Sequence, residues 1–338
     1  MTAASDRPAT GGPADPSPRR SLETPHRRTA SAPRLVERVA VIGYRSAEWV
    51  FGRLPVGPAA TVVGWFVQAS YLVWPTKRRW SNLNFGHVLG LPPDDPAVRR
   101  LALRAYRSYA RYLVETMRLG SLTQAQARAM LDPDGIELVE RIWRESNGLI
   151  FTVPHIGNND LIGAGIALQG WPLSGVADDS TFPELFEHLR RERERWGNRV
   201  IPWRNLREVY AVLKRREMLA LLVDWGYRPD DVPVRLFGAW TTLPAGPAAL
   251  AGRSGALIVP LVTRRRPDGR IYATIDEPIR VASTEPAEIL RATQAIADAL
   301  ERVIAAAPEQ WYSFKPMWPE AAAEADVLAA RAARMAAG

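Results

Sequence analysis

The chain of 338 residues is 47% hydrophobic and 24% charged, carries a formal net charge of +8 and has no cysteine. This length and apolar content suffice for a large buried core, which excludes a wholly disordered protein. The absence of cysteine excludes disulfides, thiolate zinc sites, iron–sulfur clusters and a cysteine nucleophile. With four histidines we expect no metal site, and the positive charge favours an anionic partner: nucleic acid, a lipid surface or a phosphorylated substrate.

The first third of the chain is predicted to hold a tail and a helical part. Residues 1–33 are rich in Pro, Gly, Ser, Thr and Arg, so we expect a disordered tail without a signal peptide. Residues 54–76 carry no charge, and a helix is expected over about 59–74. That helix either spans a bilayer or lies at its surface, because tryptophans and the basic run 77–79 suit a headgroup boundary. An ordinary buried helix is the alternative.

A second helix is predicted over residues 96–119. It combines an apolar stripe with a neighbouring row of arginines, formed by Ala102, Tyr106, Tyr109, Leu113 and Met117 and by Arg104, Arg107, Arg111 and Arg118. A core stripe with a solvated flank explains this pattern as well as a membrane contact does. We therefore interpret residues 34–120 as an N-terminal helical, membrane-associated part.

From residue 121 to 318 the pattern alternates between strands and helices. Apolar runs predict strands at 149–154, 173–177, 199–203, 218–225, 232–238, 256–265 and 271–276, and helices are expected at about 183–196, 205–215, 246–253 and 286–306. Such alternation is typical of an α/β fold with a central, largely parallel sheet flanked by helices. Residues 319–338 are rich in alanine and are expected to form a C-terminal tail, as a frayed helix.

One histidine stands where a ligand would bind. His155 follows the strand 149–154 and precedes a helix, at the carboxyl end of the sheet where α/β proteins bind ligands. If Asp160 lies in the first turn of that helix, its carboxylate can reach back to the imidazole and raise its basicity. Gly157 permits a tight turn, and Asn158 or Asn159 can cap the helix. A histidine in this position is also commonly structural.

A second segment reaches the same edge of the sheet. Asp224 ends the strand 218–225, so its carboxylate should face the edge that holds His155, although a strand-end cap is the alternative. Residues 241–247 are expected to form a loop that leads into a helix, with Pro247 at a favoured first position. We expect Thr242, Gly246 and Pro247 to bind substrate there, because backbone N–H groups at a helix start attract a phosphate or a thioester carbonyl.

Several of these motifs resemble a known family. VPHIGNNDL (153–161) resembles the His-x4-Asp/Glu motif of the lysophospholipid acyltransferase superfamily, and DWG (224–226) and LPAGPAALA (243–251) resemble its lipid A (lauroyl-type) and phosphatidylinositol mannoside acyltransferase branch. So do NLNFGHVLG (82–90), YRSYARYLVETMRL (106–119) and QWYSFKPMW (310–318). The resemblance covers about residues 35–318. There is no Phe-Pro-Glu-Gly segment, which disfavours the glycerolipid enzymes, and Asn159-Asp160 and Asp224-Trp225 depart from the lipid A pattern, which leaves the acceptor open.

The resemblance implies a glycerolipid-acyltransferase-like fold and direct acyl transfer. His155 would be the general base, Asp160 would orient it, and Asp224 would orient it from further away or orient the acceptor. Gly157, Asn158, Arg204 and Arg253 would help to bind substrate, although both arginines have structural alternatives.

We therefore expect an O-acyltransferase at the cytoplasmic face of the cell membrane, peripheral or anchored by residues 54–76. The expected donor is acyl-CoA or an acyl-carrier protein, the acceptor is a hydroxyl of a lipid or glycolipid, and the docking surface is anionic lipid. No cofactor or metal is expected. Nucleic acid is not expected as a partner, because no recognition motif interleaves the aromatic residues with Lys or Arg. A catalytically inactive lipid-binding protein of the same fold remains the alternative.

Overall fold

The computed structural model describes residues 34–132, 135–179 and 182–338, so the predicted tail at 1–33 lies outside the described residues. Its centre is a six-stranded sheet in the order β3-β2-β4-β1-β7-β8. The strands are β1 (Leu149–Val153), β2 (Leu173–Ala177), β3 (Arg199–Pro202), β4 (Met218–Leu222), β7 (Leu257–Arg265) and β8 (Ile271–Ile275). All neighbours pair in parallel except β7 and β8. The predicted α/β fold with a largely parallel sheet is confirmed.

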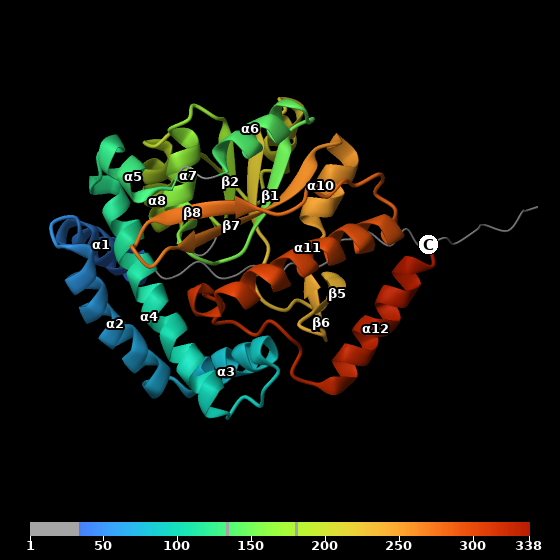
Figure 1. The fold of residues 1–338 in the computed structure, drawn as a ribbon, viewed down its shortest axis with the longest axis horizontal. Helices are drawn as coiled ribbons and strands as arrows, with labels where there is room; N and C mark the ends of the chain where they lie inside the picture. Colours follow the sequence, from blue (N-terminus) through green and yellow to red (C-terminus); the bar gives the residue numbers. More distant parts are fainter. Residues whose placement is uncertain (1–33, 133–134, 180–181) are drawn as a thin grey trace, which may run out of the picture.

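Helices cover both faces of this sheet (Figure 1). On one face Ile150 of β1 packs into a cluster with α9 (Leu206–Lys214), α10 (Gly246–Ser254) and α11 (Pro286–Ala306). On the other face Leu149 and Phe151 pack against α7 (Asn159–Ala167), with α5 (Gln124–Met130) and α6 (Ile136–Arg144) beside it. Every residue of β1 is buried. A parallel strand that is covered on both faces has a nearly continuous apolar sequence, which is why the apolar run at 149–154 predicts a strand.

Four helices precede the sheet: α1 (Arg34–Phe51), α2 (Val56–Val73), α3 (Pro75–Leu89) and α4 (Pro96–Arg118). In Figure 1 they lie to the left of and below the sheet. The predicted helices at about 59–74 and 96–119 are confirmed as α2 and α4, which pack along each other. Asp95 caps α4 by accepting a hydrogen bond from the N–H of Ala97 at 2.7 Å. The basic run 77–79, which follows α2, lies in the first part of α3.

Helix α2 is long and apolar enough to span a membrane, and only 22% of its residues are buried in the protein. Its outer face presents large apolar side chains, among them Trp65 and Phe66, which are 66% and 71% exposed. An ordinary buried core helix would have hidden these rings, so that alternative is wrong.

The predicted loop at 241–247 is partly wrong. Residues Ala239–Leu243 form β6, which pairs with β5 (Val232–Leu236) as an antiparallel hairpin. Its two-residue turn, Phe237-Gly238, has positive φ at both positions, the geometry that matches the twist of the strands. Phenylalanine is an unusual residue for that conformation, so the sequence did not reveal the turn.

The C-terminal helix α12 (Ala322–Ala336) packs against α11 and the β5–β6 hairpin. Leu328 and Ala332 face that contact and are buried. The remaining helix, α8 (Pro183–Glu194), lies between β2 and β3 in the chain and contacts α1 and β3.

Candidate active site

His155 lies two residues beyond β1, and Asp224 lies two residues beyond β4. The two strands are neighbours in parallel register, with Val153 opposite Leu222, so the residues that follow them reach the same level of the sheet edge. The imidazole Nδ1 lies 2.6 Å from Asp224 Oδ1, and the backbone N–H of His155 donates to both carboxylate oxygens at 2.9 and 3.1 Å. The register of the sheet thus creates a His–Asp pair.

The carboxylate of Asp224 is 3% exposed and has a further partner on a distant segment. The indole Nε1–H of Trp311, itself fully buried, donates to Asp224 Oδ2 at 2.8 Å. Because an ionised carboxylate only accepts, the pairing fixes the imidazole proton on Nδ1 and leaves Nε2 as the basic nitrogen.

The charges of this pair affect both pKa values. Burial alone would lower the pKa of His155, but the adjacent Asp224 carboxylate stabilises the imidazolium, and the pKa is raised above its ordinary value. Burial would conversely raise the pKa of Asp224, but His155 and the hydrogen bond from Trp311 hold it below its ordinary value. Asp224 is therefore ionised at neutral pH and favours protonation of His155.

The predicted hydrogen bond between Asp160 and His155 is wrong. Asp160 lies in the first turn of α7, and its carboxylate accepts from Arg193 at 2.8 Å and from the Tyr112 hydroxyl at 3.2 Å. Asp160 follows His155 by five positions, along a turn that points the two side chains to different partners. Asp224 takes the orienting position that was expected for Asp160.

A pocket of about 180 Å³ opens beside the imidazole. It is lined by Lys77, His155, Asp224, Trp225 and the segment 312–315. The His155 side chain is 31% exposed, and the edge of its ring meets Trp225 with the ring centroids 5.1 Å apart. A cavity therefore adjoins the base, although Asp160 makes no hydrogen bond to His155.

Several pocket residues had no role in the sequence interpretation. Lys77, Trp225 and Lys315 line the pocket, and Trp311 contacts Asp224 behind it. These residues come from the segments 77–79, 224–226 and 310–318, and the chain positions of Lys77, Trp311 and Lys315 give no sign of proximity to His155. One sequence feature could have indicated a role for the segment 310–318: it is aromatic and lies far along the chain from any predicted strand.

The turn that carries His155 is built by Gly157 and Asn158. Gly157 has φ +64°, and a Cβ there would collide with the backbone of Thr263, so the position requires glycine. Asn158 caps α7 by accepting from the Leu161 N–H at 3.0 Å, as predicted, and its amide donates to Glu115 at 3.2 Å. The Asn158 side chain is buried and both of its groups are paired, which supports a structural role, and its direct contact with substrate stays a prediction.

The other residues that were predicted to contact substrate lie in different parts of the structure. Thr242 is buried, exchanges two hydrogen bonds with the backbone of Arg228 and is not among the described residues that line the His155 pocket, so its substrate role stays a prediction. Gly246 and Pro247 begin α10, which leads back to the start of β7, so they lie towards the carboxyl edge of the sheet as predicted. Neither is among the described residues that line the His155 pocket.

Both predicted arginines are also displaced from the base. Arg253 lies at the other end of α10, donates to the Tyr210 hydroxyl at 2.9 Å and shares a cavity with Asn147 and Arg216 at the amino edge of the sheet. It is not among the described residues that line the His155 pocket, and its contact with substrate stays a prediction. Arg204 is exposed, stacks over Trp203 and follows the edge strand β3, which β2 and β4 separate from β1.

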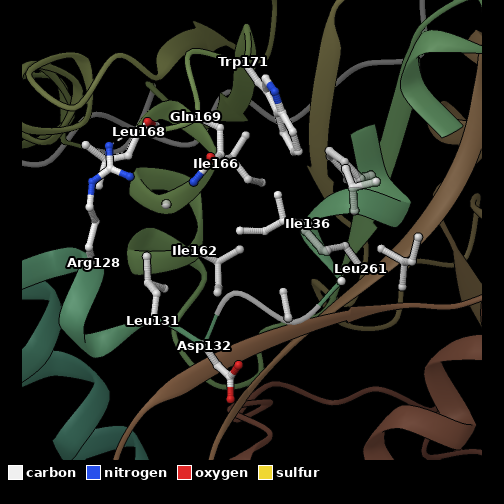
Figure 2. Close-up of a pocket in the computed structure, with 16 residues that line it drawn as sticks. Arg128, Leu131, Asp132, Ile136, Ile162, Ile166, Leu168, Gln169, Trp171 and Leu261 are labelled. Carbon is white, nitrogen blue, oxygen red and sulfur yellow. Dashed lines mark hydrogen bonds between the residues drawn. The ribbon is translucent and has the colours of Figure 1, made fainter. Parts of the chain in front are cut away.

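Two apolar cavities lie under α7, on the face of the sheet opposite α10 and α11. The first, about 240 Å³, is drawn in Figure 2, where Leu131, Ile162 and Ile166 turn towards it and the charged ends of Arg128 and Asp132 lie at its border. The second, about 160 Å³, shares Phe151, Ile162, Ile166 and Leu261 with the first. It also reaches Asn159 and Asp160, directly after the His155 turn. The described residues hold no cluster of His, Asp and Glu suited to a metal ion.

Comparison with known proteins gives a consistent result. A model of a family described as bacterial lipid A biosynthesis acyltransferases matches residues 61–320. A phosphatidylinositol mannoside acyltransferase from Mycolicibacterium smegmatis is 29% identical over 243 residues, covering 70% of this chain and 77% of that protein. One of the same name from Mycobacterium tuberculosis is 28% identical over 250 residues, covering 70% and 75%. These similarities confirm the resemblance that the sequence motifs indicated.

Proposed function

Because the chain belongs to the family of bacterial lipid A biosynthesis acyltransferases, and is therefore an acyltransferase, we propose that it moves a fatty acyl group from a thioester to a hydroxyl of a membrane glycolipid. The observation that carries this proposal is the His155–Asp224 pair beside an open pocket. The similarity to phosphatidylinositol mannoside acyltransferases favours a mannosylated inositol phospholipid as the acceptor. Acyl-CoA or an acyl-carrier protein would supply the acyl group.

The proposed reaction needs one base and no covalent enzyme intermediate. His155 Nε2 takes the proton of the acceptor hydroxyl as its oxygen attacks the thioester carbonyl carbon. The tetrahedral adduct then collapses, the carbon–sulfur bond breaks, and the imidazolium returns the proton to the leaving thiolate. Asp224 stabilises the imidazolium throughout, and general-base assistance of this kind contributes about 10²–10⁴-fold to the rate.

The apolar cavities under α7 fit the acyl chain. Their walls are aliphatic and aromatic, and the second begins at Asn159 and Asp160, next to the turn that holds the base. A chain lying there would extend along the sheet face and place its thioester near His155. The Asp160–Arg193 ion pair at this cavity would then act on the donor rather than on the base.

The outer face of α2 supports a location at the membrane surface. Trp65, Phe66 and Leu72 are exposed, and Lys77 and Arg78 follow at the start of α3. Apolar rings beside cations suit the boundary between anionic headgroups and acyl chains. We propose that this face docks on the cytoplasmic leaflet, where both substrates would be available.

The test is acyl transfer by purified protein given radiolabelled acyl-CoA and a total mycobacterial lipid extract. The wild type should acylate a glycolipid, and His155→Ala should lower the rate by about 10²–10⁴-fold with an unchanged circular dichroism spectrum. His188→Ala is the matched control, since His188 pairs with Glu48 on the α1–α8 contact and should leave the rate unchanged. Equal transfer by His155→Ala would refute the mechanism, and lipid binding without transfer by the wild type would favour the inactive alternative.

A further inference from the structure

Lysine is rare in this protein, and its few positions are informative. Of the 44 lysine and arginine residues, three are lysines: Lys77, Lys214 and Lys315. Two of the three, Lys77 and Lys315, line the pocket that contains His155. They come from the start of α3 and from the segment after α11, more than 200 residues apart, so the fold brings them together at the base.

Neither pocket lysine forms an ion pair with a carboxylate among the described residues, and Asp178 acts on Lys315 only from a longer distance. Their ammonium groups lie over aromatic rings instead: Lys77 over Trp74 and Trp80, 5.9 and 4.7 Å from the ring centroids, and Lys315 over Trp225 at 4.9 Å. Partial burial, together with the positive charges of Arg228 and Lys77, lowers the pKa of Lys315. The pocket therefore brings two ammonium groups together, while the Asp224 carboxylate in its lining is already engaged by His155 and Trp311.

This arrangement is unfavourable for the protein alone. Like charges repel, and Lys77 lies in the first turn of α3, where the helix dipole disfavours a cation. Two arginines that are largely withdrawn from solvent, Arg193 and Arg265, instead pair directly with carboxylates. Lysine differs from arginine in being a compact point charge with three rotatable donors, which suits a tetrahedral phosphate.

We propose that Lys77 and Lys315 together bind a phosphoryl group of a substrate and so place that substrate against His155. The inference rests on the proposed acyl transfer and names a recognition element for it. The phosphoryl group belongs either to the headgroup phosphodiester of the acceptor lipid or to the phosphopantetheine arm of the thioester donor. The two arginines expected to bind substrate, Arg204 and Arg253, are not among the described residues that line this pocket.

Binding of the anion also acts on the base. The positive charge of Lys315 lowers the pKa of His155, opposing Asp224. A phosphoryl group between the two lysines screens that charge, so the imidazole gains a proton more readily once the substrate is bound. The same contact thus positions the substrate and favours proton transfer to Nε2.

Calorimetric titration with two soluble probes tests the proposal. Glycerophosphoinositol represents the acceptor headgroup and desulfo-coenzyme A represents the donor, with myo-inositol and pantothenate as their phosphate-free counterparts. The proteins are the wild type, Lys77→Gln, Lys315→Gln, the double variant, and Lys214→Gln as the matched control on the opposite edge of the sheet. None of these substitutions touches the His155–Asp224 pair, and no turnover is needed to read the result.

We expect at least one phosphorylated probe to bind the wild type, each single substitution to weaken it about fivefold, and the double substitution to weaken it about 25-fold. Lys214→Gln should bind as the wild type does. The probe that loses affinity identifies the source of the phosphate. Unchanged affinity in the double variant, or no binding of either probe to the wild type, overturns the inference. Binding through the lysines by a wild type that transfers no acyl group would instead refute the proposed function alone.

Discussion

Asp224 accepts hydrogen bonds from three donor groups on two residues, and these bonds decide which nitrogen of His155 is basic. The backbone N–H and Nδ1 of His155 and the indole of Trp311 all reach its carboxylate. A buried carboxylate with this many donors stays ionised and cannot rotate freely. The single residue thus sets the tautomer, the orientation and the basicity of the imidazole.

The directions of the two pKa shifts define a pH dependence. The reaction requires neutral His155, and its pKa is raised, so the rate should increase with pH through a value above that of an ordinary histidine. The pairing stabilises the fold fully below the pKa of an unfolded histidine, and this contribution is lost as pH rises through the folded pKa. Asp224 acts in the opposite sense, because its lowered pKa gives stability that is lost only in acid.

The sequence predicted the base but not its partner. His155 follows a strand and precedes a helix, a pattern that is readable from local residues. The choice between Asp160 and Asp224 depends on strand order and register. Strands β1 and β4 are neighbours in the sheet, although 64 residues lie between the end of β1 and the start of β4 in the chain. No local sequence pattern shows that these two strands are neighbours. The sequence therefore favours Asp160, the carboxylate that is closer to His155 along the chain.

At the scale of elements, the outer face of α2 exposes large apolar side chains to solvent. We predict that the double variant Trp65→Ser, Phe66→Ser loses about 2 kcal/mol of membrane binding, about thirtyfold in partition coefficient, because two large rings no longer leave water. Co-sedimentation with vesicles of phosphatidylglycerol and phosphatidylcholine measures this loss. Val327→Ser on α12, an exposed apolar residue on another face, is the control. Equal binding by all three proteins would exclude α2 as the docking surface.

Elements with a simple apolar pattern were predictable, and those held by polar contacts were not. The buried parallel strands and α4 have continuous or helical apolar patterns. Helix α3 instead buries Ser81, Asn82 and Asn84, so its sequence does not resemble an amphipathic helix. Its stability comes from hydrogen bonds to distant segments, which sequence periodicity does not record.

At the scale of the whole molecule, Asn84 connects the N-terminal helices to the segment that supports the site. Its amide donates to the carbonyls of Ser313 and Lys315 at 3.0 and 2.6 Å, and its oxygen accepts from the Met317 N–H at 3.0 Å. This segment holds Trp311, which contacts Asp224, and Lys315, which lines the pocket. The motifs 82–90 and 310–318 are therefore two halves of one contact.

We predict that Asn84→Ala destabilises the protein by about 2–4 kcal/mol, since three buried backbone groups lose their partner. Urea denaturation measures this change. Asn205→Ala removes the exposed cap of α9 and should cost about 1 kcal/mol, which makes it the matched control. If the cap variant were the less stable of the two, Asn84 would not have the connecting role assigned to it.

The most direct test of the His155–Asp224 pair is the pH dependence of kcat/KM for acyl transfer, measured for the wild type, Asp224→Asn and Asp160→Asn. The wild type should show an apparent pKa above that of ordinary histidine, and Asp224→Asn should lower both that pKa and the rate, the latter by about 10²-fold or more. Asp160→Asn should leave the apparent pKa close to the wild-type value, because its carboxylate pairs with Arg193. A pKa that moves with Asp160 and not with Asp224 would contradict the assignment.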